Sequence, residues 1–233
     1  MPLPEIVTPT YTLTVPSTKK KLKYRPFLVK EQKVLILALE NKDQEQILDA
    51  VITVLKNCII TKTKIEDLSL FDLEFIFLQI RARSISEEIE LKVTCADDGQ
   101  TEVDVRFMVD DVNVHFPKGH ERLIDLTDEI KVEMRYPDLE YFSTVNFGDA
   151  AKIDPYELVG KFIKRVYVGE DANDDFTAEE AKEWVEKLTS EQFDKIQNFF
   201  NTMPTLRHEI KVKNPKTKVT NPVVIEGLAD FFA

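Results

Sequence analysis

The hydrophobic pattern changes its period within the first forty residues. Residues 10–27 alternate between apolar and polar side chains on both sides of a turn signal at Pro16-Ser17-Thr18, which predicts a β-hairpin. Residues 29–41 follow directly and are apolar on most of the surface of a predicted helix. A helix with so little polar surface cannot stay solvated, so we expect another part of this chain or another protein to cover it.

Two further helices are predicted before the pattern changes again. Residues 43–57 repeat their apolar side chains at helical spacing, and residues 65–83 are apolar on nearly all sides. The phenylalanine-rich stretch 71–80 within the second of these helices has two interpretations: it lies in the core, or it lies in an interface between subunits.

The middle of the chain has the period of β-strands. Residues 88–108 alternate on both sides of a turn signal at Cys95–Gly99, which predicts a second hairpin. Three more short strands are predicted at 112–116, 122–126 and 130–136. We expect these strands to form a small antiparallel sheet in the centre of the chain.

Helix start signals return after residue 136. Asp154 precedes Pro155 and Glu157, a combination typical of a helix N-terminus, and we expect this helix to run to about Val168. Capping boxes at Thr177–Glu180 and Thr189–Gln192 predict two more helices.

The chain then returns to strands. Pro204 ends the last of these helices, and residues 207–225 predict a final hairpin with its turn at Asn214–Thr217. The fold class is therefore α+β: an N-terminal hairpin with helices, a central antiparallel sheet, and C-terminal helices that end in a hairpin. The weakest boundary divides the chain into 1–136 and 137–233, and a single domain is the alternative.

The charge of the chain excludes some partners. The net charge is −11, which disfavours nucleic acid and anionic membranes as partners and permits a basic protein. No apolar run reaches the length of a membrane span, and the first residues lack the pattern of a secretory signal.

Residues 1–35 are basic on balance and residues 170–191 are strongly acidic. One hypothesis is that neighbouring copies or partners meet through these opposite charges, and the alternative is that both are solvated surfaces.

Two candidate metal sites were compared with the ligand patterns of zinc and calcium sites, and neither has all the ligands that its metal requires. Cys95 with His115 and His120 would leave a structural zinc ion one ligand short. Residues 171–175 open like a calcium-binding EF-hand loop, but Phe176 and Lys182 occupy the positions that require Gly and Glu. We therefore expect no metal and no other cofactor.

Catalytic motifs are missing as well. The chain has no nucleophile elbow, no metalloprotease motif and no glycine-rich phosphate loop, so we do not expect an enzyme. A hydrolase with an unrecognised pair of carboxylates remains an alternative of a different class.

The end of the chain is the strongest candidate for a partner contact. Three large apolar side chains close the sequence, namely Leu228, Phe231 and Phe232. They either pack back on their own domain or insert into a groove of a partner, because exposure costs about 1.5–3 kcal/mol for each side chain. Their spacing is similar to that of sliding-clamp-binding peptides, although Ile225 stands where such peptides carry Gln. The second candidate is the basic N-terminal hairpin, with Lys20, Lys21, Lys23 and Arg25.

Four stretches spread over the chain carry a resemblance to a known family. They are PTYTLTVPSTKKKLKYRPFLVKEQKVLILALE at 9–40, FDLEFIFLQIRARSISE at 71–87, LTSEQFDKIQNFFNTMPTLRHEI at 188–210 and EGLADFF at 226–232. Together they resemble the baseplate hub subunit and hub assembly proteins of T-even-like contractile-tailed bacteriophages. The resemblance implies a protein of the virion tail, or of the host cytoplasm during assembly, that binds other tail or baseplate proteins.

Several roles are compatible with this resemblance. The chain either stays in the virion as a structural subunit or acts as a transient assembly chaperone for a tail protein such as the tape measure. Self-association is a further alternative to binding other tail proteins. A clamp-binding replication accessory protein is an alternative of a different class.

Overall fold

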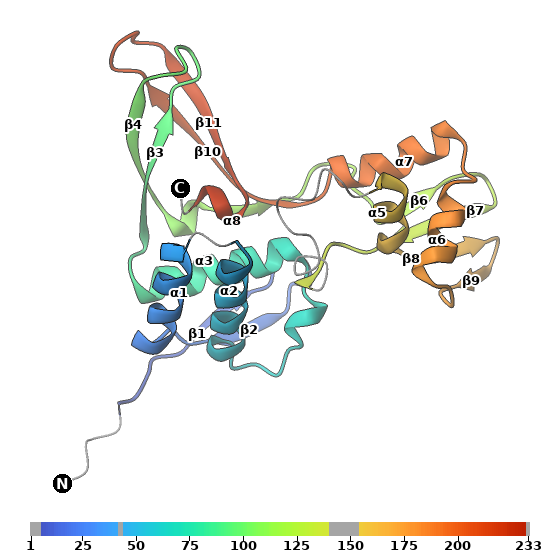
Figure 1. The fold of residues 1–233 in the computed structure, drawn as a ribbon, viewed down its shortest axis with the longest axis horizontal. Coiled ribbons are helices and arrows are strands. Elements are labelled where there is room, and N and C mark those ends of the chain that lie inside the picture. Colours follow the sequence, from blue (N-terminus) through green and yellow to red (C-terminus); the bar gives the residue numbers. More distant parts are fainter. Residues whose placement is uncertain (1–5, 42–43, 140–153, 232–233) are drawn as a thin grey trace. The chain divides into compact units, whose positions relative to one another are not determined.

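The computed structural model of the chain describes residues 6–41, 44–139 and 154–231, which form helices and small antiparallel sheets (Figure 1). The chain divides into two compact units. The first comprises residues 1–115 and 205–233, and the second comprises residues 116–204. The second unit is thus an insertion into the first, and the boundary expected after residue 136 falls inside it.

The first unit contains all three predicted hairpins and the N-terminal helices. Its elements are β1 (Tyr11–Thr14), β2 (Lys21–Tyr24), α1 (Val29–Asn41), α2 (Gln44–Cys58), the 3-10 turn η1 (Ile65–Asp67), α3 (Leu70–Ser84), β3 (Glu88–Thr94), β4 (Glu102–Met108), the 3-10 turn η2 (Val109–Asp111), β5 (Asn113–His115), β10 (Thr205–Lys213), β11 (Thr220–Glu226) and α8 (Gly227–Asp230).

Helix α3 is the centre of the first unit. Ile76, Leu78 and Ile80 are completely buried, and Phe71 and Phe77 are nearly so. A core cluster joins α3 to β3, β4, β5, β10 and β11 through apolar side chains. The phenylalanine-rich stretch of this helix is therefore core of its own unit.

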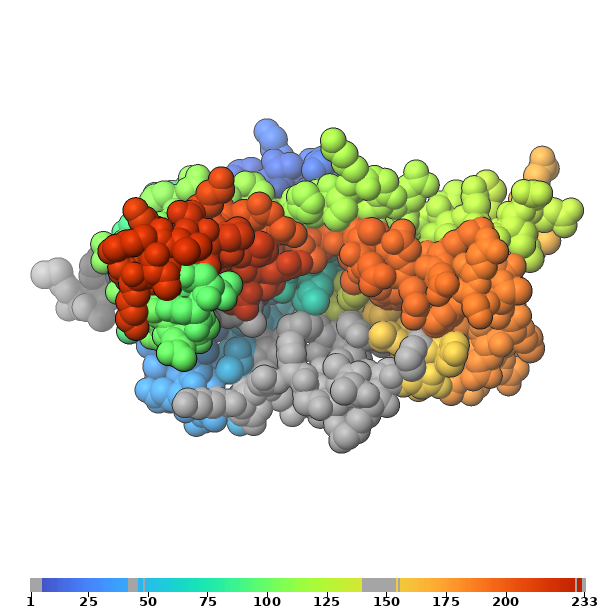
Figure 2. All heavy atoms as spheres, turned by 90° about the horizontal axis from the view of Figure 1, so that it is seen from above, coloured from blue at the N-terminus to red at the C-terminus, as the bar shows by residue number. Residues whose placement is uncertain are grey.

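Two long hairpins stand on this core. β3 pairs with β4 from Glu88↔Met108 to Thr94↔Glu102, and β10 pairs with β11 over a similar length. Figure 2 shows the atoms of β3–β4 (green) lying directly against those of β10–β11 (red). At the tips, the carboxylate of Asp97 accepts hydrogen bonds from Asn214 Nδ2 at 3.0 Å and Asn221 Nδ2 at 2.9 Å, so side chains lock the two turns together.

The second unit is a sheet with helices on one face (Figure 1). Its elements are β6 (Leu123–Asp125), β7 (Ile130–Met134), α5 (Pro155–Phe162), β8 (Ile163–Val168), β9 (Asp171–Asn173), α6 (Ala178–Val185) and α7 (Ser190–Asn201). The antiparallel strands follow the order β6-β7-β8-β9. Val132 and Met134 of the sheet are completely buried in a core that includes Ile196 and Phe199 of α7.

The helix start signals of this unit are confirmed. Asp154 accepts a hydrogen bond from the Tyr156 backbone at the start of α5, and both capping boxes form at α6 and α7. The expected end of the first helix is wrong. α5 ends at Phe162, and residues 163–168 form β8 because their β-branched and aromatic side chains suit a strand that pairs with β7.

The predicted central strands all form, but they belong to three sheets. β3 and β4 form a sheet of their own, β5 joins β10 and β11, and β6 and β7 join β8 and β9. Alternation along a strand marks which face is buried, and it carries no information about which strand lies beside it.

Candidate protein-contact surface

Helix α1 is fixed to its unit by a buried ion pair. Glu31 is only 2% exposed, and its Oε1 lies 3.0 Å from Arg25 Nη2. Its Oε2 accepts the backbone N–H of Leu28 at 2.7 Å, which satisfies one free amide at the helix N-terminus. Burial opposes ionisation of Glu31, but the hydrogen bonds from Arg25 and Leu28 outweigh it and lower the pKa of the carboxyl group. The start of α1 therefore has a defined position.

The rest of the α1 surface is open to solvent, and large apolar side chains are exposed there beside Lys30, Lys33 and Glu40. Only Glu31 and Ala38 of this helix are buried. Five large apolar side chains are between 40% and 81% exposed, namely Val29, Val34, Ile36, Leu37 and Leu39. We call these five side chains the α1 apolar face. The helix packs mainly against α2, so the described residues cover it less completely than we expect from the sequence.

The basic hairpin is partly available to a partner. Lys20, Lys21 and Lys23 are exposed on β1–β2 and its turn. Arg25 is instead engaged, because its guanidinium group pairs with Glu31 and donates to the Pro26 carbonyl at 2.8 Å. The three lysines are therefore accessible to a partner, whereas Arg25 holds the start of α1 in place.

The turn of this hairpin is anchored on α3. The Ser17 backbone N–H donates to Asp72 Oδ1 at 3.0 Å, and the Ser17 hydroxyl donates to the same carboxylate. Ser69 Oγ also donates to Asp72 Oδ2, at 2.6 Å. Asp72 is completely buried, so these bonds fix the base from which the lysines project.

The C-terminal segment packs back on its own unit. Phe231 is 1% exposed, and its ring meets that of Phe107 edge to face with 6.2 Å between centroids. The half-buried Leu228 donates its backbone N–H to Glu74 Oε1 at 3.0 Å. Phe232 lies outside the described residues. The placement of Leu228 and Phe231 agrees with the first of the two alternatives, in which the segment completes its own core.

The two candidate metal sites do not assemble among the residues that the structure describes. In the described part of the chain, no three His, Cys, Asp or Glu side chains gather as a metal site would require. Cys95 and Cys58 are both completely buried, and burial raises the pKa of the Cys58 thiol to about 11. This thiol is therefore protonated and a poor nucleophile near neutral pH. None of the described helices has both the length and the apolar character needed to cross a bilayer.

These features define an α+β protein whose first unit has exposed apolar and basic side chains. A model of the family described as T4 bacteriophage base plate protein matches residues 8–233. The chain belongs to this family, and it is therefore a viral structural protein of the phage tail baseplate. Comparison with curated proteins and with solved structures found no match.

The sequence predicts that the helix at 29–41 is apolar and needs a cover. It does not predict which side chains of this helix stay exposed once the chain has folded. The signal was the continuous apolar run at 34–39, which is longer than one buried helix face requires.

Proposed function

We propose that this baseplate protein is a structural or assembly component of the tail hub and that it acts by binding other tail proteins. The α1 apolar face is the observation that carries the proposal. It presents five aliphatic side chains from a helix whose start is fixed by the Arg25–Glu31 pair. A rigid apolar surface binds a partner with little loss of conformational entropy on its own side.

The energy available at this face is sufficient for a specific contact. Removing an aliphatic side chain completely from water contributes about 1.5–3 kcal/mol, and these side chains are already partly covered. Lys30 and Lys33 are exposed on the same helix, with Lys33 one turn from Val29 and Leu37, and they would add charged contacts to the apolar ones. The exposed Lys20, Lys21 and Lys23 are proposed as a second, electrostatic contact, which would accelerate association with an acidic partner.

The proposal is tested by co-expressing the chain with neighbouring tail proteins and purifying the resulting complex. We expect the Ile36→Lys/Leu37→Lys double variant to lose most of the captured protein, because two charges replace the centre of the apolar face. Val224→Lys is the matched control, since Val224 is similarly exposed but lies on β11. The thermal unfolding midpoints of both variants should stay close to that of the original protein. Equal capture by the double variant and the control would exclude the α1 apolar face as the contact.

A structural subunit and a transient chaperone for a tape-measure-type protein make different predictions about the mature particle. Mass spectrometry of purified tails measures whether the chain remains bound. We expect a stoichiometric amount relative to other baseplate proteins if the chain is a structural subunit. Its near-absence from finished tails would leave the assembly role and exclude the structural one.

A further inference from the structure

The second unit contains an open groove that is independent of the α1 apolar face. The groove has a volume of about 430 Å³ and lies between strands β8 and β9 and helix α6. Its apolar lining consists of Ile163, Val166, Val168, Ala172, Phe176, Ala181 and Trp184. Val168, the last residue of β8, is 55% exposed, so this part of the lining is accessible to solvent. A large aliphatic side chain from another polypeptide would find apolar contacts here.

A free strand edge borders this groove. β9 is the outer strand of its sheet: it pairs with β8 on one side and, among the described residues, with no strand on the other. Its residues Asp171, Ala172 and Asn173 are all exposed. Such an edge offers backbone donors and acceptors to an added extended segment, with adjacent pockets for alternate side chains.

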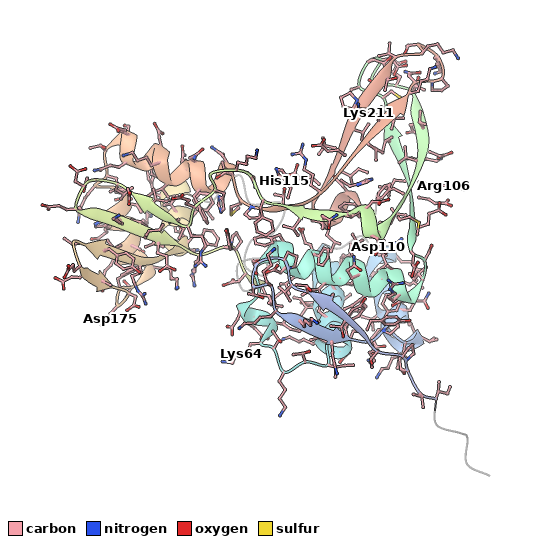
Figure 3. All side chains as sticks on the ribbon, turned by 180° about the vertical axis from the view of Figure 1, so that it is seen from behind. Lys64, Arg106, Asp110, His115, Asp175 and Lys211 are labelled. Atoms are coloured by element: carbon pink, nitrogen blue, oxygen red, sulfur yellow. The ribbon has the colours of Figure 1, made fainter. Side chains whose placement is uncertain are left out.

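The rim of the groove is acidic. Asp171, Asp175 and Glu180 line it, and Figure 3 shows Asp175 at the periphery of the second unit. Glu180 is engaged in the capping box of α6, whereas Asp171 and Asp175 form no ion pair with any residue that the structure describes. Residues 170–191 contain nine carboxylates and two lysines. The groove therefore favours an extended segment that is accompanied by positive charge.

The first unit supplies a segment with these properties. Residues 6–10 form neither helix nor strand and lead away from β1 (Figure 1). Ile6 and Val7 in this segment are 91% and 90% exposed. Lys23 lies opposite Thr12 on the neighbouring strand, so positive charge is close to the point where the segment leaves the hairpin.

We propose that copies of this chain associate head to tail, with residues 6–10 of one copy added to the β9 edge of the next. Because neighbouring side chains of an extended segment point to opposite faces, one of Ile6 and Val7 would enter the groove. Lys21 and Lys23 of the same copy would face Asp171 and Asp175 of the next. This contact joins two different surfaces, so a pair of copies still has one free segment and one free groove, to which further copies can add. The inference does not depend on the proposed hub function.

Complementation between two variants tests this arrangement in the full-length protein. Ile6→Asp/Val7→Asp blocks the segment, and Val168→Lys blocks the groove. A lysine at position 168 is compatible with the fold because the site is exposed and Asp171 lies directly opposite. By analytical ultracentrifugation, we expect the original protein to gain mass with concentration and each variant to remain a monomer. An equimolar mixture of the two variants should form a dimer and no larger species, because only one segment and one groove remain intact.

Two controls make the result specific. Val219→Asp removes a similarly exposed aliphatic side chain from the β10–β11 turn region and should leave self-association unchanged. Trp184 fluorescence reports directly on the groove and should confirm that the Val168→Lys variant is folded.

The proposal is overturned if the original protein is a monomer at every concentration, or if the mixed variants stay monomeric. Both monomeric variants should still capture other tail proteins as the original protein does. The result on self-association would then be independent of the result for the α1 apolar face.

Discussion

At the residue scale, the most unusual group is the carboxyl group of Glu74. It lies on α3 and accepts the backbone N–H of Leu228, which ties the C-terminal segment to the core helix. Burial raises the pKa of Glu74 to about 7; the Leu228 hydrogen bond opposes the shift, and the nearby Glu226 adds to it. Gly227 precedes the contact with a φ of 72°, a left-handed conformation that glycine adopts without strain.

This carboxyl group makes the stability of the first unit depend on pH. The folded-state pKa lies above that of an unfolded glutamate, so the native state binds more protons between about pH 4.5 and pH 7. Stability should therefore fall as the pH rises through this window. Glu74→Gln keeps an oxygen acceptor for Leu228 and removes the charge. We expect this variant to be more stable than the original protein by about 1–3 kcal/mol at pH 8 and nearly equal to it at pH 4.5.

Calorimetric unfolding at the two pH values measures this difference. The single tryptophan, Trp184, lies in the second unit, so its fluorescence transition is an internal control that should not respond to the variant. A stability gain of equal size at both pH values would contradict a role for the Glu74 charge.

At the element scale, one residue, Asp97, makes the main contacts between the tips of the two long hairpins, through its side chain and through its backbone N–H, which donates to Asn221 Oδ1 at 3.0 Å. Asp97 in the β3–β4 turn binds Thr217 and Asn214 in the β10–β11 turn and Asn221 at the start of β11. Hydrogen bonds from Thr217 and then Asn214 hold the pKa of this carboxyl group below its usual value. Asn214 and Asn221 are buried, so losing the Asp97 acceptor would cost stability.

Asp97→Ala should separate the hairpin tips. The variant removes the carboxylate that accepts from both buried amides, and we expect the unfolding midpoint of the first unit to fall by several degrees. Amide hydrogen exchange should increase in both turns and much less near the base of the hairpins. Asp104→Ala is the matched control, because Asp104 is exposed on β4 of the same hairpin. If Asp97→Ala and the control unfold at the same temperature, the tip contact does not stabilise the unit.

Because the folded-state pKa of Asp97 is lowered, its contribution should be present above about pH 4 and disappear as the pH falls further.

At the scale of the whole molecule, the second unit is inserted between two neighbouring strands of the first. His115 ends β5 and Thr205 begins β10, and these two residues face each other in an antiparallel pair. The insertion therefore leaves and re-enters the first unit at points about 5 Å apart. Each unit also has its own hydrophobic cluster.

Removing the insertion should leave a folded first unit. Replacing residues 116–204 with Asn-Gly would convert β5 and β10 into a two-residue hairpin, for which this dipeptide is well suited. We expect the shortened protein to unfold cooperatively and to keep the pH dependence attributed to Glu74. Residues 116–204 expressed alone should show a cooperative Trp184 fluorescence transition. A shortened protein without a cooperative transition would show that the first unit needs the second in order to fold.

Local signals in the sequence were sufficient to identify most of the elements. The capping residues Asp154, Thr177 and Thr189 act within one helical turn, and the hairpins at 88–108 and 207–225 are defined by alternation around a short turn. The end of α5 at Phe162 was missed because residues 163–168 become a strand only through pairing with β7.

The sequence by itself therefore determined the α+β class, the helix start signals, the hairpins and the presence of a first helix too apolar to be solvated on all sides. Only the tertiary structure decided which strands pair outside the three predicted hairpins, that Phe231 and Arg25 contact their own unit, and which side chains of α1 stay exposed. The physical reason is the range of the interactions. Caps and turns depend on residues a few positions apart, whereas burial and strand pairing depend on segments such as 113–115 and 205–207, which lie about ninety residues apart along the chain.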